Sequence, residues 1–182
     1  MTDNPSMNRL KGSVVLIAGA ASGIGASIAQ RCIAEGARIV CADYDAGAAT
    51  ALADRLGASA IGCRCDVTDA ASARRAVDIA KECFGRLDGL VHNAAAPSTS
   101  ATVVDLDETA WRRELDVGLT GAFLMSKFAV PLIAAGGGGS VVFIGSISSQ
   151  GNRGQISYAS TKAGLEGAAA TIMKEAMYYG VR

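Results

Sequence analysis

A tyrosine and a lysine lie four residues apart in the segment Tyr158-Ala159-Ser160-Thr161-Lys162. The Ala-rich, apolar surroundings predict a helix, and residues four apart in a helix emerge on one face. A free phenol has a pKa of about 10, so acid–base work near pH 7 needs roughly 4 kcal/mol of differential stabilisation. An ammonium group one turn away, in a partly dry site, is a source of it. The alternative for this short pattern is that Tyr158 packs while Lys162 is a solvated surface charge.

A glycine-rich turn follows the first buried-strand pattern. The run Ser13–Ala18 is short, apolar and rich in β-branched residues, which is typical of a strand buried on both faces. The turn is followed by a helical pattern that Gly36 can end. Strand, glycine turn and helix in this order present backbone N–H groups and a helix N-terminus to the phosphates of a dinucleotide. The turn residues expected to bind the cofactor are Gly19, Ser22, Gly23, Ile24 and Gly25.

An acidic residue ends the second predicted strand, where Arg38–Ala42 leads into Asp43. A carboxylate at this place accepts hydrogen bonds from both hydroxyls of the adenosine ribose and repels a 2′-phosphate. Neither Ser22 nor Tyr44 supplies a cation for that phosphate. The pattern therefore favours NAD over NADP, and exchanging Asp43 for alanine with a basic residue beside it should move the preference toward NADP. The alternative for Asp43 is an ordinary turn residue that acts with Asp45.

The order of these motifs resembles the short-chain dehydrogenase/reductase family nearly end to end. The matching positions are Gly19, Gly23, Gly25, Asp43, Asp66, Val67, Asn93, Ala94, Ser146, Tyr158 and Lys162. Alternating strand and helix patterns predict an α/β fold with a doubly wound parallel sheet in three layers. The resemblance implies a Rossmann-type sheet that lacks its last strands, since the chain ends at Arg182. It also implies hydride transfer between NAD(H) and a secondary alcohol, ketone or oxoacyl-type substrate.

The resemblance implies a role for each catalytic position. Tyr158 would protonate a carbonyl oxygen during reduction or take the alcohol proton during oxidation, and Lys162 would stabilise the phenolate and bind the nicotinamide ribose. Ser146 would hold the substrate oxygen. Ser148 and Ser149 compete for that role, and a strand-end cap is the structural alternative for Ser146. Hydride would pass directly between C4 of the nicotinamide and the substrate carbon.

The resemblance also implies contacts to the adenosine half of the cofactor. Asp66 and Val67, expected to end the third strand, would recognise adenine, and Asn93 and Ala94 would pass close to the adenosine-side ribose. Asp66 has an alternative role as the cap of a helix that begins near Asp69. For Asn93 and Ala94 the alternative is a plain strand-to-loop turn.

Three features depart from the family pattern. Gly118 stands where the family carries an asparagine that holds a proton-relaying water, and a glycine costs its helix about 1 kcal/mol. We therefore expect impaired turnover, which Gly118→Asn should raise. The chain also reads His92-Asn93-Ala94-Ala95 and Ala18 where the family has Asn-Asn-Ala-Gly and threonine. It stops at Arg182, before the family's sixth strand. A catalytically impaired or dead fragment that serves in dinucleotide binding or in interaction with a partner is therefore the rival hypothesis.

Composition predicts a single domain over residues 1–182, with a loose tail over residues 1–9, and the resemblance implies that this is a dinucleotide-binding domain that is C-terminally incomplete. Half of the 182 residues are hydrophobic, enough for a substantial core. Seventeen basic and seventeen acidic residues cancel, so there is no surplus charge to attract nucleic acid or an anionic membrane. No apolar run reaches the length of a membrane span and the N-terminus is polar, so we expect a cytoplasmic protein.

The cysteines and the single histidine are not spaced as metal ligands, so the sequence predicts no metal site. Five scattered cysteines indicate reduced thiols in the core, and no second cysteine or histidine pair completes a zinc site with Cys63 and Cys65. His92, the only histidine, is expected to be structural or adjacent to the cofactor rather than an acid–base catalyst. By resemblance, the small residues of the helix that carries Tyr158 predict a homodimer or homotetramer interface, and tight packing on the chain's own sheet is the alternative.

Overall fold

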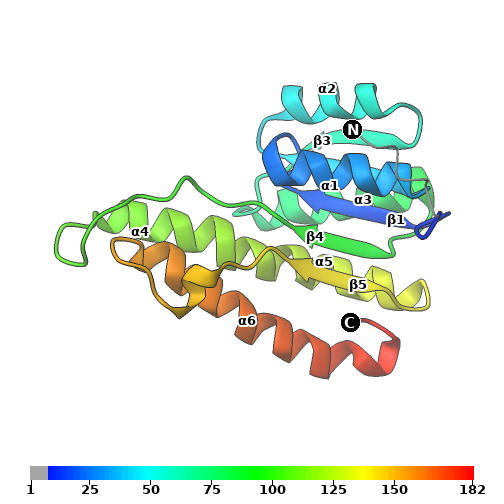
Figure 1. The fold of residues 1–182 in the computed structure, drawn as a ribbon. Helices are drawn as coiled ribbons and strands as arrows, with labels where there is room; N and C mark the ends of the chain where they lie inside the picture. The colour runs from blue at the N-terminus through cyan, green and yellow to red at the C-terminus, as the bar shows by residue number, and fades with distance from the viewer. Residues whose placement is uncertain (1–7) are drawn as a thin grey trace.

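Five parallel strands form one sheet in the computed structural model, which describes residues 8–182 (Figure 1). The strand order is β3-β2-β1-β4-β5. The strands are β1 (Val14–Ala18), β2 (Arg38–Asp43), β3 (Ala60–Arg64), β4 (Gly89–His92) and β5 (Ser140–Phe143). The order changes direction between β1 and β4, the point at which doubly wound sheets open a crevice beyond their carboxyl ends. The expected doubly wound α/β fold is confirmed.

Helices cover both faces of this sheet, with α1 and α2 on one side and α3, α5 and α6 on the other (Figure 1). The α-helices are α1 (Gly23–Ala34), α2 (Ala46–Leu56), α3 (Ala70–Phe84), α4 (Glu108–Leu115), α5 (Gly121–Ala135) and α6 (Ile156–Ala176). A π-helix, η1 (Asp116–Thr120), joins α4 to α5, and two 3₁₀ turns are η2 (Ile147–Gln150) and η3 (Met177–Tyr179). The segment that contains α4 projects beyond the end of the sheet.

The position of β1 in the centre of the sheet explains why its sequence is continuously apolar. Alternate residues of a strand point to opposite faces, and both faces of β1 are covered. Leu16 packs with the α3 and α5 side of the core, whereas Ile17 packs with the α1 and α2 side. All five residues of β1 are buried, so an apolar residue is needed at every position.

The third strand is shorter than the sequence predicts. It ends at Arg64, so Asp66 lies just beyond it. The N-cap of α3 is Asp69, whose carboxylate accepts a hydrogen bond from the Ser72 N–H at 2.6 Å. The alternative that Asp66 caps this helix is therefore wrong, and Asp66 instead accepts from the Thr68 N–H at 3.0 Å.

The start of the described chain is held against the end of α1. Residues 1–7 of the expected loose tail lie outside the described residues. Arg9 donates a hydrogen bond from its guanidinium to Glu35 Oε1 at 2.8 Å, and Arg31 donates to the same oxygen at 2.5 Å. The hydrogen bond from Arg9 lowers the pKa of Glu35 to about 2. Arg9 is thus tied to the fold through a buried carboxylate.

The last described residues pair with the edge strand β5. Val181 forms a parallel bridge with Gly139, and the Val141 N–H donates to the Arg182 carbonyl at 2.8 Å. Beyond this bridge β5 is only partly covered, and Val142 is 45% exposed. β5 is therefore the half-buried edge of the sheet in the part of the chain that the structure describes.

One helical stretch contradicts the expectation that no segment has the length of a membrane span. Within residues 8–182, the helical stretch Glu108–Ala135 is long and apolar enough to cross a membrane by length and composition alone, with a mean hydropathy of 1.6 over 18 residues. Core helices of globular proteins share this length and composition, and Met125, Ala129 and Ile133 of this stretch pack in the core against the sheet.

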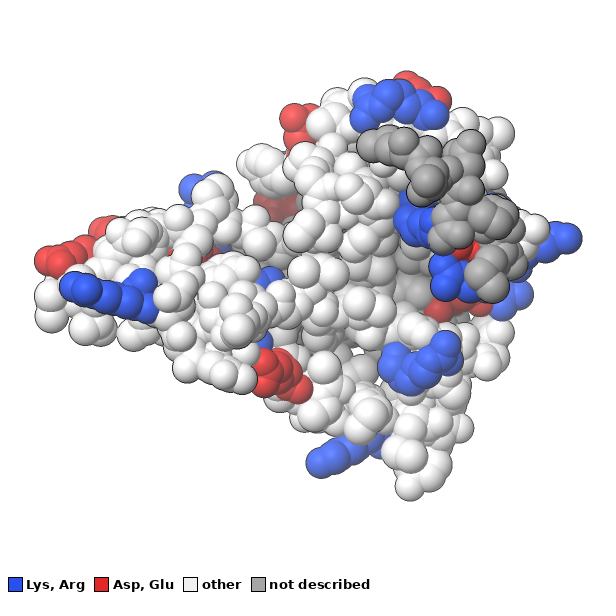
Figure 2. Space-filling model, in the orientation of Figure 1, with Lys and Arg blue, Asp and Glu red and all other residues white. Residues whose placement is uncertain are grey.

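On the face shown in Figure 2, charged side chains of both signs are scattered among uncharged ones.

Candidate active site

The glycine turn between β1 and α1 is built for close backbone approach. Gly19 has a φ of +77°, and a Cβ there would lie 2.7 Å from the backbone nitrogen of Ala94. A Cβ on Gly25 would overlap the Gly19 carbonyl. The N-cap residue Ser22 is extended and makes no side-chain cap. The first N–H groups of α1 therefore point outward without a capping side chain, which is the arrangement that binds a phosphate.

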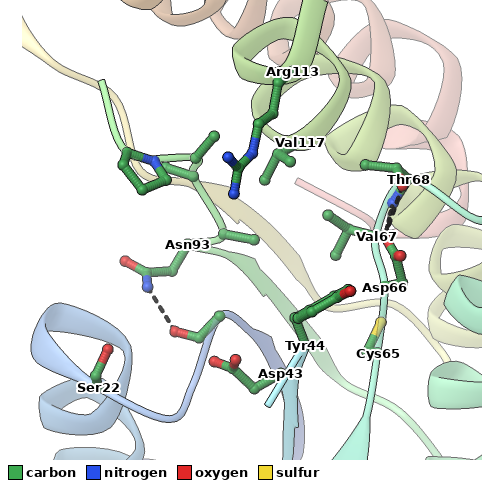
Figure 3. Close-up of a pocket in the computed structure, with 15 residues that line it drawn as sticks. Ser22, Asp43, Tyr44, Cys65, Asp66, Val67, Thr68, Asn93, Arg113 and Val117 are labelled. Carbon is green, nitrogen blue, oxygen red and sulfur yellow. Dashed lines mark hydrogen bonds between the residues drawn. The ribbon is translucent and has the colours of Figure 1, made fainter. Parts of the chain in front are cut away.

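The turn opens into a cavity of about 510 Å³ at the carboxyl ends of the strands (Figure 3). The cavity brings together most of the positions predicted to bind the cofactor, from four separate strand ends. These are Gly19, Ser22, Asp43, Asp66, Val67, Asn93 and Ala94. Of the other predicted positions, Gly23, Ile24 and Gly25 form the first turn of α1 beside the cavity. Tyr158 and Lys162 lie on α6 and are not among the residues that line the cavity.

Asp43 joins the end of β2 to the glycine turn. Its Oδ2 accepts from the Ala21 N–H at 2.9 Å, and its Oδ1 accepts from the Asp45 N–H at 3.1 Å. The turn contact with Asp45 is therefore present, and it coexists with exposure of the carboxylate to the cavity. Each carboxylate oxygen keeps a lone pair for a further donor such as a ribose hydroxyl.

Asn93 braces the glycine turn from the end of β4. Its Nδ2 donates to the Gly19 carbonyl at 2.8 Å, as Figure 3 shows. The same amide would meet a Cβ on Gly25. Asn93 thus does more than turn the chain, because its side chain fixes the floor of the cavity.

The structure adds two arginines that sequence reasoning missed. Arg64 lies opposite Asp43 in the β2–β3 register, with its guanidinium carbon 5.1 Å from the ring centroid of Tyr44. Arg113 projects from α4 into the cavity, one helical turn before Val117 (Figure 3). Neither arginine belongs to an ion pair among residues 8–182. No local pattern in the sequence marks either residue: Arg113 reaches the cavity through the placement of α4, and Arg64 approaches Asp43 through strand pairing.

Lys162 and Tyr158 lie in the first turns of α6, close to the end of β5. The Lys162 residue is 5% exposed, and its Nζ donates to the Ile144 carbonyl at 2.5 Å. The same Nζ lies 5.4 Å from the ring centroid of Tyr158. Burial lowers the pKa of Lys162. The alternative of a solvated surface lysine is therefore wrong, and an ammonium group does stand beside the phenol ring.

Three serines follow β5 and differ in their surroundings. Ser146 caps η2, and its Oγ accepts from the Ser148 N–H at 3.1 Å. Ser148 is buried, and its own hydroxyl lies 3.4 Å from Gln155 Oε1. Ser149 borders a separate shallow groove. The capping role of Ser146 is thus observed, and because the cap uses only a lone pair, its hydroxyl proton stays free for another acceptor.

Gly118 lies buried within the π-helix η1. A Cβ placed there would overlap the Cγ2 methyl of Thr161 on α6. The expectation that Gly118→Asn raises the rate assumed room for a side chain, and the structure leaves none while Thr161 keeps its methyl group. Glycine at this position is therefore required by packing, rather than being only a helix-weakening residue.

His92 is buried beneath the cavity at the end of β4. It is 2% exposed, its ring meets Phe143 edge to face at 6.3 Å, and its ring nitrogens face the backbone of Val117 and Gly118 without a well-aligned hydrogen bond within residues 8–182. Burial, with a smaller contribution from the charge of Lys162, lowers the pKa of His92 to about 4. The imidazole is therefore neutral at pH 7, which agrees with a structural role.

Acid is expected to destabilise the protein through His92 as the pH falls from 6.5, the ordinary value, toward about 4. The unfolded chain takes up the proton before the folded chain does, so the stability present above pH 6.5 is lost across this window. His92→Asn removes the titrating ring, and we expect its melting temperature to fall by about 5 °C less than that of the wild type between pH 7.5 and 5. Thermal denaturation at the two pH values measures this, and equal losses would contradict it.

The cysteines give no sign of a metal centre. Within residues 8–182 no group of three or more His, Cys, Asp or Glu side chains is arranged to hold a metal ion. All five cysteines are free thiols. Burial raises the pKa of Cys41 and of Cys63 to about 11, so both are protonated core residues near neutral pH.

Comparisons with known proteins agree with this geometry. A family model described as short chain dehydrogenase matches residues 13–182. The chain is 40% identical over 185 residues to trans-4-hydroxycyclohexanecarboxylate dehydrogenase of Sinomonas cyclohexanicum, covering 96% of this chain and 71% of that protein. It is 34% identical over 189 residues to (3R)-3-hydroxyacyl-CoA dehydrogenase of Mus musculus, covering 97% and 73%. A solved short-chain dehydrogenase/reductase structure from Burkholderia xenovorans superposes with a TM-score of 0.89 at 38% identity, covering 96% and 72%.

Proposed function

Because this chain belongs to the short chain dehydrogenase family, we propose that it is an NAD(H)-dependent oxidoreductase that interconverts a secondary alcohol and a ketone. The observation that carries the proposal is the buried ammonium of Lys162 beside the Tyr158 ring, in a chain whose glycine turn also shapes a cavity. The two relatives named above are dehydrogenases of hydroxylated substrates, which supports the same reaction class.

The residues of the cavity fit a dinucleotide. The open N-terminus of α1 and Gly19 would hold the diphosphate, and Asp43 would bind the adenosine ribose hydroxyls. Asp66 and Val67 would border the adenine. The nicotinamide ring supplies the hydride chemistry, and the protein supplies placement. Asp43 makes NAD the preferred form in this proposal, because its charge repels a 2′-phosphate.

The proposed acid–base step uses three side chains at the ends of β5 and α6. Tyr158 gives a proton to the carbonyl oxygen in reduction and takes the alcohol proton in oxidation. Lys162 stabilises the phenolate, and after its hydrogen bond to Ile144 it keeps two N–H donors for a ribose hydroxyl. Ser146 donates its hydroxyl proton to the substrate oxygen. The capping bond leaves that proton free, because Ser146 Oγ only accepts in it.

A dinucleotide-binding protein without turnover is the second candidate, favoured by Gly118 in place of a polar side chain. Titration calorimetry with NADH, combined with a turnover screen, separates the two. The screen should include hydroxycyclohexanecarboxylates, 3-hydroxyacyl thioesters and small secondary alcohols. NADH oxidation or NAD reduction with any of these supports the enzyme, whereas binding without turnover selects the second candidate. No binding at all contradicts both.

Arg113 is expected to strengthen binding of the adenosine half of NADH. The Arg113 guanidinium belongs to no ion pair among the described residues and projects over the pocket, where it can stack on a base or meet a phosphate. We expect Arg113→Met to raise the Kd for NADH by about tenfold, and to leave the Kd for reduced nicotinamide mononucleotide unchanged. Arg112→Met is the matched control, because Arg112 pairs with Glu108 at 3.3 Å outside the cavity. Equal effects of the two substitutions would contradict the assignment.

We also propose that α5 and α6 form the contact of a homodimer or homotetramer in the cytoplasm. A groove of about 370 Å³ lies between these helices, and Phe123 and Met173 are 57% and 50% exposed. Gly167 has open space beside it, whereas Gly164 packs against Leu119 of the same chain. Different faces of α6 thus serve internal packing and a free surface, and sedimentation velocity measures whether that surface is paired.

A further inference from the structure

The π-helix η1 touches both the cofactor cavity and the catalytic helix. Val117 of η1 lines the cavity, as Figure 3 shows. The next residue, Gly118, is buried against Thr161 of α6. A π-turn inside a long helix is rare, and such turns often occur at functional sites. Here the turn places two consecutive residues on two different parts of the proposed active site.

Both the methyl and the hydroxyl group of Thr161 contact the helix around this π-turn. The residue is 3% exposed, and its Cγ2 methyl occupies the space that a Cβ on Gly118 would take. Its hydroxyl donates to the Glu114 carbonyl at 3.4 Å, in the last turn of α4 before the π-helix. The hydroxyl is buried and has one acceptor, so removing that bond would leave a buried polar group unpaired.

A second close contact between a glycine and a larger side chain joins η1 and α6 beside the first. A Cβ on Gly164 of α6 would overlap the side chain of Leu119 of η1. Each element therefore offers one glycine to a larger residue of the other: Gly118 receives Thr161, and Gly164 receives Leu119. We call these two contacts the interlock. Close packing of this kind leaves little freedom for one element to shift against the other.

Thr161 lies between the proposed acid–base residue and the proposed cofactor-binding lysine. Tyr158 is three residues before it and Lys162 is the next residue, all within the rigid helix α6. A displacement of α6 at Thr161 would move both functional groups. A shift of about 1 Å in a reacting group is enough to lower a rate by roughly 100-fold.

We propose that Thr161 is a positioning residue, and that the interlock with Gly118 sets the place of Tyr158 and Lys162 relative to the cofactor cavity. The proposal rests on the proposed function. It accounts for glycine at position 118, because the threonine methyl fills the space that a side chain there would need. It also means that positions 118 and 161 have to be exchanged together.

A size exchange tests the interlock. In Gly118→Ala the new methyl overlaps Thr161 Cγ2, whereas the Cβ and Oγ1 of Thr161 would lie 3.7 and 3.9 Å away, at ordinary contact. Thr161→Ser removes only the obstructing methyl and keeps the hydroxyl. We expect Gly118→Ala to lower kcat by at least tenfold and the double variant Gly118→Ala/Thr161→Ser to return kcat to within about threefold of the wild type.

The matched control and the second readout separate positioning from general damage. Gly47→Ala also adds a methyl to a helical glycine, but on the exposed surface of α2, where the nearest atom, Asp45 Oδ1, would lie at 3.4 Å, and it should leave kcat unchanged. The Kd for ADP, measured by titration calorimetry, should stay within about threefold in every variant, because ADP would occupy only the half of the cavity that Asp43 and Asp66 border and would not reach Lys162. A kcat loss without a Kd change indicates misplaced catalytic groups, whereas a structural defect would move both.

The outcomes are distinct. Wild-type kcat in Gly118→Ala, or a double variant no faster than Gly118→Ala, overturns the interlock alone. Absence of turnover in the wild type with every substrate overturns the proposed function and the interlock together. If Gly118→Ala does not fold, Thr161→Ser by itself decides, because it should fold and lower kcat by about threefold at unchanged Kd. An unchanged kcat in that variant contradicts the proposal.

Discussion

Tyr158→Phe is expected to lower kcat by about 10³-fold while the Kd for NADH stays within about twofold of the wild type. The substitution removes one oxygen and keeps the ring that lies under the Lys162 ammonium. Positioned acid–base groups contribute roughly 10² to 10⁴-fold to a rate, and the phenol is the proposed proton donor and acceptor. Steady-state kinetics with the best substrate from the screen, together with NADH titration, measures both quantities.

The chain offers a matched control for this loss. Tyr178 lies in η3, just beyond the other end of the helix that carries Tyr158, and is 86% exposed. Tyr178→Phe makes the same chemical change far along the chain from the proposed proton transfer and should leave kcat unaltered. If Tyr158→Phe also kept kcat within about tenfold of the wild type, the acid–base assignment would be wrong.

Asp43→Ala is expected to change cofactor preference by about 100-fold in the ratio of kcat/KM for NADP to that for NAD. The alanine no longer binds the ribose hydroxyls and no longer repels a 2′-phosphate. The cation that a 2′-phosphate needs is already close, because Arg64 lies opposite Asp43 on the neighbouring strand and stacks on Tyr44. A basic residue therefore does not have to be introduced, contrary to the expectation from sequence.

The double variant Asp43→Ala/Arg64→Met isolates the contribution of that arginine. It should retain the weakened NAD binding and lose most of the gain toward NADP, since the guanidinium is removed and nothing replaces its charge. Arg64→Met alone should leave NAD kinetics close to those of the wild type. A double variant as active with NADP as Asp43→Ala would show that Arg64 does not bind the phosphate.

Local patterns along the chain were enough to place the nucleotide half of the site. Gly19 and Gly25 are glycines because the backbone there folds onto itself and onto Ala94 within one turn. The turn follows a strand whose continuous apolar run reflects cover on both faces. Asp43 was found because it ends the next strand. Parallel strands bring such ends to one edge, so the order of motifs predicts their meeting in the cavity.

Contacts between distant segments decided the rest. Arg64 approaches Asp43 only through the register of β2 and β3. His92 gives no local sign that its ring would be buried against the backbone of Val117 and Gly118, without a well-aligned hydrogen bond in the described part of the chain. The cost of glycine at position 118 was predicted from helix propensity, yet its reason lies at Thr161, far along the chain. Propensity describes a residue and its neighbours in sequence, and it carries no information on which side chain fills the space opposite.

The residue types therefore establish which chemistry this chain can perform: a phosphate-binding turn, a ribose-binding carboxylate and a phenol with an ammonium group one helical turn away. Folding establishes whether those groups work together. The burial of Lys162, its hydrogen bond to Ile144 and the packing of α6 on the π-helix arise from elements that are remote in sequence. Motifs are read from bonded neighbours, whereas burial and fit depend on side chains that only the packed core brings into contact.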